Sequence, residues 1–376
     1  MRILLNTSPL VSSDKTGIGY YVSNLYEELI RSGIEVHPTV DTTVQPFLNT
    51  LRRISSRLRE IFGEWYPSFV RDIGDVLISL LLRKESTLVN YDLYHETTLD
   101  AMPEIKIRSI CNLYDLTFVV YPELLPLNLA SSCRTNVEKN ITAAKRVIVN
   151  TKSIKDEAVD LLKLNEEKID VIPLAPSRAF QAMDKSVPLP KQARRLTVKD
   201  YILYVGTVEP RKGLKTLILA FRDIRRKYDL SLVIAGGLGW LYDDIISYPE
   251  KLGIKGDVLF TGYIAEASLF HLYRHASVFV YPSLYEGFGL PPLEAMACGI
   301  PVIISDIPSL REVAGDAAIA FNPKDPEELA HALDRVLSSE SSRIEMKNKG
   351  LLKSAEYSWE KVVTATIQTY QKALKD

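Results

Sequence analysis

The sequence predicts an α/β protein made of two doubly wound, parallel-sheet units. Short β-branched runs alternate with longer segments of helical period, which is the pattern of βαβ units. This alternation occurs twice, on either side of a polar stretch at 181–199 that contains Pro188 and Pro190. A chain of 376 residues is also long for one core, because single cores stop growing at about 250–300 residues. We therefore expect two domains with a ligand cleft between them.

The first half is expected to hold one sheet with covering helices. Runs rich in β-branched residues predict strands at 2–6, 92–95, 108–112, 146–150 and 169–172. Apolar residues at helical spacing predict helices near 19–31, 127–143 and 153–162. We place the first domain at residues 1–187 and a linker at 188–199.

The second half repeats the pattern and then becomes helical. Its predicted strands are 201–205, 230–235, 258–261, 277–281, 301–304 and 317–321, with helices between them. After Asp325 we expect only helices. We place the second domain at 200–356, and we expect the last helix, within 357–376, to return to the first domain.

Composition excludes several classes of protein. The chain has 46 basic and 47 acidic residues and a formal net charge of −1, so wholesale nucleic-acid binding is not expected. Cys111, Cys133 and Cys298 show no CxxC spacing, so neither a disulfide framework nor a zinc site is indicated. The apolar run at 76–82 is interrupted by Ser79 and is shorter than the roughly 18 residues of a membrane-spanning helix. The N-terminus turns polar too early for a signal peptide, and we expect a cytoplasmic protein.

A glycine pair follows the first predicted strand. Gly17 and Gly19 precede a helix, so backbone N–H groups there could approach a phosphate. The third glycine of a dinucleotide fingerprint is replaced by Val22, which argues against a nicotinamide cofactor. An ordinary strand-to-helix turn is the alternative.

A loop from Gly206 to Gly213 follows the first strand of the second half and carries Arg211 and Lys212. Both cations precede a predicted helix, where they add positive charge to the positive end of its dipole. An anion such as a diphosphate would relieve this repulsion, with a forked guanidinium and a point-charge ammonium as its partners. Two solvated charges in an exposed turn are the alternative.

Two carboxylates frame a glycine-containing loop after the strand at 277–281. Gly287 and Gly289 permit close backbone approach, with Glu286 on the loop and Glu294 in the first turn of the next helix. Carboxylates accept paired hydroxyl groups well, so the two could hold different parts of a polyhydroxylated ligand. For Glu294 alone, an acid that complements the helix dipole is the alternative.

Together these motifs resemble the retaining glycosyltransferase family 4, of GT-B fold. The resemblance covers nearly the whole chain and also rests on the segment from Arg311 to Ala318. It implies that Glu294 holds the nucleotide ribose, Glu286 the hydroxyls of the transferred sugar, and Lys212 the diphosphate. The other residues expected to surround the sugar nucleotide are Gly17, Gly19, Gly206, Thr207, Arg211, Tyr263, Ile264, Gly287, Phe288, Gly289 and Leu290.

The chain departs from the family pattern at two positions. Thr207 stands where many relatives carry Arg, and we expect Arg211 to take a share of that role. Tyr114 replaces the histidine of a His-Asp pair whose second member is Asp115. A backbone carbonyl also acts near the anomeric carbon in the family, and Tyr114 can supply it. We also expect His95 to point toward the cleft, with a structural role as the alternative.

The resemblance implies a metal-free transfer. No Asp-x-Asp pair, the usual metal anchor for a diphosphate, occurs in the chain, so cations and helix dipoles are expected to stabilise the leaving group. The resemblance also implies front-face attack through an oxocarbenium-like state. No cofactor is expected.

Likeness of residues 206–212 to one subgroup favours mannose transfer from GDP-mannose, with GDP-rhamnose or a UDP-sugar as alternatives. The expected acceptor is a glycan or lipid-linked glycan of bacterial lipopolysaccharide O-antigen or capsule synthesis. A sugar-nucleotide epimerase and a catalytically silent nucleotide-sugar-binding protein are the competing hypotheses.

Residues 51–84 form a basic amphipathic stretch. Seven basic and four acidic side chains give a local charge of 7 − 4 = +3, and apolar residues recur at helical spacing. Such a segment could lie on an anionic membrane, giving peripheral association with the inner face of the plasma membrane. A helix packed on its own domain is the alternative.

Overall fold

The computed structural model describes residues 1–11, 17–39, 90–103, 105–177, 180 and 200–376. Two parallel six-stranded sheets organise these residues, one in each half of the chain. The basic stretch 51–84 and the expected linker 188–199 lie outside the described residues. Within the described ranges, no helix has the length and apolar character needed to cross a bilayer.

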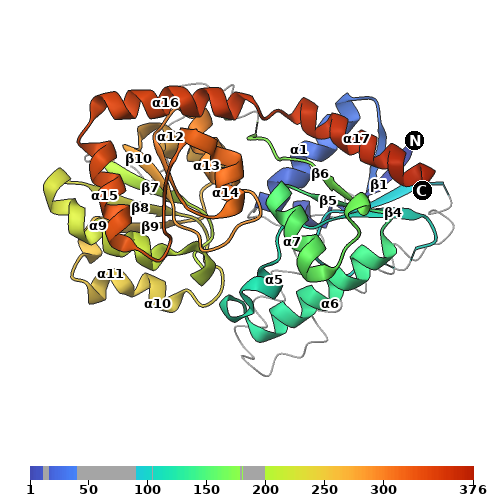
Figure 1. Cartoon of the computed structure of the whole chain (residues 1–376), viewed down its shortest axis with the longest axis horizontal. Coiled ribbons are helices and arrows are strands. Elements are labelled where there is room, and N and C mark those ends of the chain that lie inside the picture. Colours follow the sequence, from blue (N-terminus) through green and yellow to red (C-terminus); the bar gives the residue numbers. More distant parts are fainter. Residues whose placement is uncertain (12–16, 40–89, 104, 178–179, 181–199) are drawn as a thin grey trace.

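The first sheet has the order β2-β1-β3-β4-β5-β6, and all neighbouring strands are parallel. Its strands are β1 (Arg2–Leu5), β2 (Glu35–Pro38), β3 (Leu93–Glu96), β4 (Arg108–Asn112), β5 (Arg146–Val149) and β6 (Ile169–Val171). The α-helices described in this half are α1 (Gly17–Arg31), α5 (Thr117–Val120), α6 (Leu127–Ala143) and α7 (Lys152–Leu162). Figure 1 shows α1 on one side of the sheet and α6 on the other. We call this unit the first domain.

Strand β2 was not expected from the sequence. It contains Glu35, His37 and Pro38, and only Val36 is buried. A strand at the edge of a sheet pairs on one side only, so it tolerates charged residues and proline that a central strand would not.

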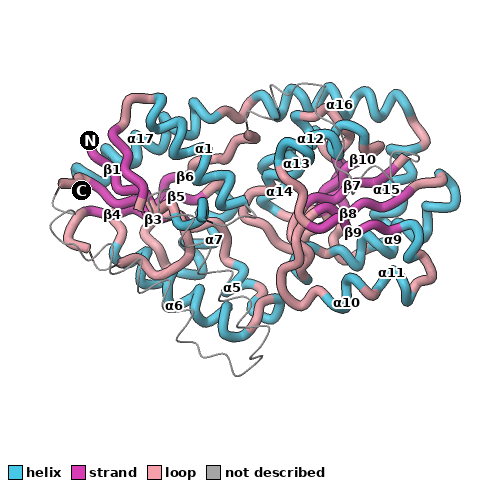
Figure 2. Tube along the Cα trace, turned by 180° about the vertical axis from the view of Figure 1, so that it is seen from behind, coloured by secondary structure: helices cyan, strands magenta, loops and turns pink. Residues whose placement is uncertain are grey.

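The second sheet has the order β12-β11-β10-β7-β8-β9 and is also parallel. Its strands are β7 (Tyr201–Val205), β8 (Ser231–Ala235), β9 (Val258–Gly262), β10 (Val278–Tyr281), β11 (Val302–Ser305) and β12 (Ile319–Phe321). Its helices are α9 (Leu214–Tyr228), α10 (Asp243–Ile246), α11 (Tyr248–Lys251), α12 (Glu266–His275), α13 (Leu290–Ala297), α14 (Pro308–Ala314), α15 (Pro326–Leu337) and α16 (Glu340–Ala355). We call this unit the second domain. Figure 2 shows the strands of the two sheets gathered in separate halves of the molecule.

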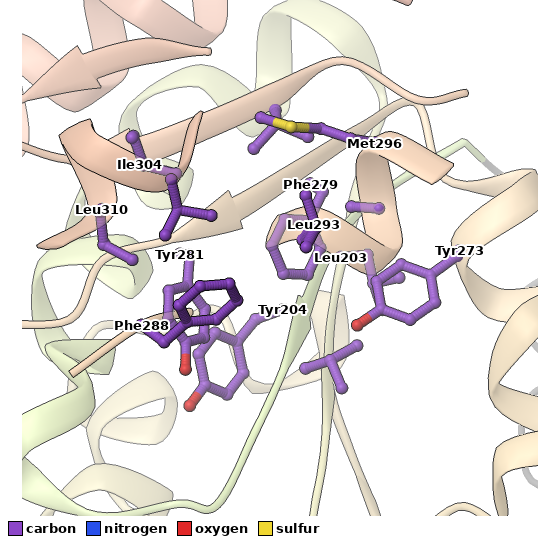
Figure 3. Close-up of a cluster of buried hydrophobic side chains, with 14 of the residues drawn as sticks. Leu203, Tyr204, Tyr273, Phe279, Tyr281, Phe288, Leu293, Met296, Ile304 and Leu310 are labelled. Carbon is purple, nitrogen blue, oxygen red and sulfur yellow. The ribbon is translucent and has the colours of Figure 1, made fainter. Parts of the chain in front are cut away.

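A cluster of aromatic side chains from the second sheet lies beneath the loops that follow β7 and β10. Figure 3 shows Tyr204 of β7 and Tyr281 of β10 side by side, with their hydroxyl groups on the same side of the cluster. The two rings stack with centroids 6.0 Å apart, and both are buried. This arrangement places phenol oxygens under the ends of the strands, where the loops begin.

The last helix, α17 (Trp359–Lys375), lies on the first domain. It contacts α1, β4 and β5, and Figure 1 shows it covering the side of the sheet where α1 lies. The indole of Trp359 donates to the carbonyl of Pro176 at 3.1 Å, which fixes the start of this helix. The predicted fold class, two doubly wound α/β domains with a returning C-terminal helix, is confirmed.

Candidate functional site

The site lies where two loops of the second sheet meet the first domain. Strands β7 and β10 are parallel neighbours, so the loops that follow them leave the same edge of the sheet. Gly213 closes the first loop with φ +63°, and a Cβ there would lie 2.0 Å from the carbonyl oxygen of Pro282 in the second loop. A glycine is therefore required for the two loops to come this close.

Opposite charges from the two loops are buried together. Lys212 Nζ donates to Glu286 Oε1 at 2.5 Å and to the Tyr281 hydroxyl at 3.1 Å. Arg211 Nη1 lies 3.1 Å from Glu286 Oε2, and Arg211 Nη2 lies 2.7 Å from Glu209 Oε1. Lys212 is 7% exposed, Glu286 8% and Glu209 2%. We call Glu209, Arg211, Lys212 and Glu286 the charge cluster.

The residues of the charge cluster shift one another's pKa values. Burial alone would raise the pKa of Glu286, but the charges of Lys212 and Arg211 outweigh it and lower that pKa to about 2. Burial lowers the pKa of Lys212, and the Arg211 charge lowers it further, while Glu286 and Glu209 oppose them. Glu286 is therefore an anion at neutral pH.

Arg211 and Lys212, which are expected to face a diphosphate, also have carboxylate partners within the protein. Both cations precede α9, but Glu286 and Glu209 already pair with them. Sequence analysis missed Glu209, whose signal was its position two residues before Arg211. Burial raises the pKa of Glu209, and the Arg211 charge counteracts this.

A second group of residues surrounds Glu294 in the first turns of α13. The Tyr273 hydroxyl donates to Glu294 Oε2 at 2.9 Å. Burial raises the pKa of Glu294 to about 7; the Tyr273 hydrogen bond lowers it, and the Glu266 charge raises it. Glu294 is thus poised to change its protonation near neutral pH.

Two tyrosines connect the domains beside Glu294. The hydroxyl of Tyr20, in α1, lies 3.1 Å from that of Tyr263, which follows β9. Burial, then Tyr263, and then the charges of Glu266 and Glu294 raise the pKa of Tyr20. Sequence analysis missed Tyr20, although it directly follows the glycine pair. Ile264, the neighbour of Tyr263, is buried.

The glycine loop after Glu286 touches the first domain. A Cβ on Gly287 would lie 1.8 Å from the carbonyl oxygen of Tyr114. Gly289 has φ +97°, and a Cβ there would lie 2.4 Å from Leu310. The Phe288 ring is buried edge-on against Tyr357, with centroids 5.9 Å apart.

Tyr114 presents its carbonyl to the site and turns its hydroxyl away. The hydroxyl donates to the Thr97 carbonyl at 2.7 Å. Asp115 Oδ1 accepts the Thr117 N–H at 2.9 Å. Burial lowers the pKa of Arg211, but the charges of Glu286 and then Asp115 act against it, and the pKa is raised. The segment carrying Tyr114 and Asp115 therefore faces the charge cluster.

His95 does not point toward the cleft. The ring is fully buried, with Nδ1 2.9 Å from the Tyr370 hydroxyl and Nε2 2.6 Å from Asn112 Oδ1. Burial lowers the pKa of His95 to about 4, so the ring is neutral. Both ring nitrogens are used to join β3 to β4 and α17, which favours the structural alternative for His95.

The remaining expected residues lie at loop and helix starts. Gly17, which is exposed, and the buried Gly19 open α1, and Leu290 opens α13. Gly206 has φ +150°, and the Thr207 carbonyl accepts the Tyr204 hydroxyl at 3.1 Å. In the part of the chain that the structure describes, no group of three or more His, Cys, Asp or Glu side chains could hold a metal ion.

Two family models and several curated proteins match this chain. The family model described as Glycosyltransferase Family 4 matches residues 15–175, and the one described as Glycosyl transferases group 1 matches residues 189–352. O-antigen chain mannosyltransferase B of Escherichia coli is 32% identical over 269 residues, which is 70% of this chain and 70% of that protein. Serotype-specific mannosyltransferase WbdA of Escherichia coli is 31% identical over 62% of this chain, a match that spans 28% of the larger relative.

Solved structures of low sequence identity share the fold. Anabaena HepE in complex with UDP and glucose has a TM-score of 0.74 at 17% identity and covers 99% of both chains. Sucrose-phosphate synthase from Thermosynechococcus elongatus has a TM-score of 0.71 at 19% identity, over 99% of this chain and 98% of that one.

Proposed function

Because this chain belongs to glycosyltransferase family 4, we propose that it transfers mannose from GDP-mannose, with retention of configuration and without a metal ion. The acceptor is a glycan or lipid-linked glycan of bacterial surface-polysaccharide synthesis, the class to which its relatives named for O-antigen belong. The observation that carries the proposal is the charge cluster, where Glu286 is held as an anion between Arg211 and Lys212.

The charge cluster provides both halves of sugar-nucleotide recognition. Arg211 and Lys212 pair with the diphosphate, and Glu286, ionised at neutral pH, accepts hydroxyl hydrogen bonds from the sugar. Glu294 accepts the ribose hydroxyls. Tyr20 and Tyr263 stand on the side of the base.

The reaction uses these groups in one displacement on the front face of the sugar. The bond between the anomeric carbon and the diphosphate oxygen breaks, and Arg211 and Lys212 stabilise the negative charge that develops on the leaving group. The acceptor oxygen forms the new bond on the same face, and its proton passes to the departing phosphate. The Tyr114 carbonyl adjoins Gly287, beside Glu286, so its negative end can stabilise the oxocarbenium-like state.

Purified full-length protein and a panel of sugar nucleotides test this proposal. GDP-mannose, GDP-rhamnose, and UDP-, ADP- and dTDP-sugars are compared by thermal shift and by slow hydrolysis, neither of which needs the acceptor. A sugar donor at about 100 Kd adds about 2.7 kcal/mol of stability, and GDP-mannose ranks first or second. Lys212→Ala, which removes a diphosphate partner, loses the shift.

Two results would contradict the proposal. Stabilisation by a UDP-sugar, with no effect of GDP or GDP-mannose, makes the mannosyl assignment wrong. Conversion of the donor to an epimer without an acceptor, or binding without any turnover when acceptor is added, favours the epimerase or the silent binding protein.

A further inference from the structure

Helix α7 of the first domain holds both sequence neighbours of Glu286. The Tyr285 hydroxyl donates to Glu157 Oε2 at 2.5 Å. On the other side, Thr151 Oγ1 donates to the Gly287 carbonyl at 2.9 Å, and Thr151 is also the N-cap residue of α7. The position of Glu286 is therefore bracketed by hydrogen bonds to an element of the other domain.

Tyr285 belongs to the second domain, but its side chain packs into the first. Its ring is buried in a cluster that includes Leu116 and Phe118, and its hydroxyl accepts the Leu116 N–H at 3.1 Å. Its backbone carbonyl accepts a hydrogen bond from Arg211 Nη1 at 3.0 Å. One residue thus connects the first domain to Glu286, its neighbour in sequence, and to Arg211.

A reciprocal contact secures α7 from the second domain. The carboxylate of Glu312, in α14, accepts the N–H groups of Lys152 and Ser153 at 2.7 and 3.0 Å. These are free N–H groups at the positive end of the α7 dipole, where a carboxylate is favourable. Helices α7 and α14 lie against each other across the domain boundary, so α7 is anchored where its side chains reach the Glu286 loop.

We propose that Tyr285 and Glu157 are positioning residues that fix Glu286 and Arg211 for the transfer through their contact across the domain boundary. The proposal rests on the function proposed above. Catalytic groups must be held within about 0.5 Å of the productive geometry, and a misplacement of about 1 Å can cost about 100-fold in rate. The hydrogen bond from Tyr285 to Glu157 therefore holds the Glu286 loop against the first domain.

The test separates positioning from folding. We compare Tyr285→Phe, Glu157→Gln and the double variant by kcat and KM for GDP-mannose hydrolysis. Tyr285→Phe lowers kcat about tenfold, with KM changed less than about threefold, because the ground-state contacts of the sugar donor remain. Glu157→Gln keeps an oxygen that accepts the hydrogen bond from the Tyr285 hydroxyl, so its kcat falls less. The kcat of the double variant is no lower than that of Tyr285→Phe alone, because both substitutions remove the same interaction.

The matched control is Tyr201→Phe, which removes another buried tyrosine hydroxyl, one that donates to the Leu272 carbonyl inside the second domain. This control lowers Tm and leaves kcat unchanged. A wild-type kcat for Tyr285→Phe, or multiplicative losses in the double variant, would overturn the proposal.

A second measurement remains decisive if no sugar nucleotide is turned over. The radius of gyration of Tyr285→Ala is compared with that of the wild type by small-angle X-ray scattering, with and without GDP. A more open molecule supports the connection through Tyr285, even though the proposed function has then failed. An unchanged radius contradicts it.

Discussion

Glu209, Lys212 and Glu286 are buried beside the partly buried Arg211, and burial of charges costs free energy. Desolvation costs several kcal/mol per ion, and a buried ion pair is often no more stabilising than apolar residues of the same volume. Fold stability alone therefore does not explain the charge cluster. Preorganised charges are most effective where charge develops during a reaction, which is the role proposed for them here.

The ionisation of Glu294 makes stability depend on pH. Its pKa is about 7 in the folded protein against an ordinary value of 4.5, so the folded state binds more protons between these values. The contribution of Glu294 to stability is therefore fully present below about pH 4.5 and is lost as pH rises to about 7, and Glu294→Gln removes this pH dependence. Tm measured from pH 5 to pH 8 checks the sign.

The affinity for GDP depends on pH in the opposite direction from the contribution of Glu294 to stability. Ribose hydroxyls donate better to a carboxylate than to a carboxylic acid, so affinity for GDP rises through about pH 7 in the wild type. Glu294→Gln loses this part of the pH dependence and keeps only the part that comes from the terminal phosphate of GDP, whose second pKa is about 6. Glu327→Gln, at an exposed position, retains the wild-type dependence. The assignment of Glu294 fails if the wild type and Glu294→Gln share the same pH profile.

Elements with strong apolar patterns could be predicted from the sequence, and contacts between them could not. The parallel strands of both sheets were identified by their β-branched runs, whereas β2 was missed because its composition suits only an edge. The charge on Arg211 and Lys212 was visible, but the pairing with Glu286, 74 residues beyond Lys212, depends on β7 lying beside β10. The orientation of the His95 ring depends on its hydrogen bond with the Tyr370 hydroxyl, 275 residues away.

Substitution of Gly287 tests whether the reaction needs the close contact between the glycine loop and the Tyr114 carbonyl. Gly287→Ala places a methyl group where the Tyr114 carbonyl lies, at 1.8 Å, so the loop and the first domain cannot meet as they do here. We expect turnover of GDP-mannose to fall by at least about tenfold, because the sugar site is then misplaced. Steady-state hydrolysis of GDP-mannose measures the loss.

Gly256→Ala is the matched control, since nothing lies within 4 Å of a Cβ there. It leaves turnover unchanged. If Gly287→Ala turns over GDP-mannose as fast as the wild type, the close contact between Tyr114 and the glycine loop has no part in the reaction.

Over the whole molecule, each domain provides what the other lacks. The second domain carries the charge cluster and Glu294, and the first provides the Tyr114 carbonyl and Tyr20. Helix α17 ties the two halves together because it follows α16 of the second domain and packs on the first (Figure 1). The two-domain arrangement was predictable from the repeated alternation in the sequence. The composite site was not, since it depends on which residues meet across the boundary.

The most direct test of metal-free mannose transfer at the charge cluster is turnover of GDP-mannose by the full chain in EDTA. The account predicts that the wild type releases GDP at the same rate with and without the chelator. It also predicts that folded Glu286→Gln is slower by at least about 100-fold, because the lost contact strengthens in the transition state. A strict requirement for an added divalent cation, or near-normal turnover in Glu286→Gln, would contradict the account.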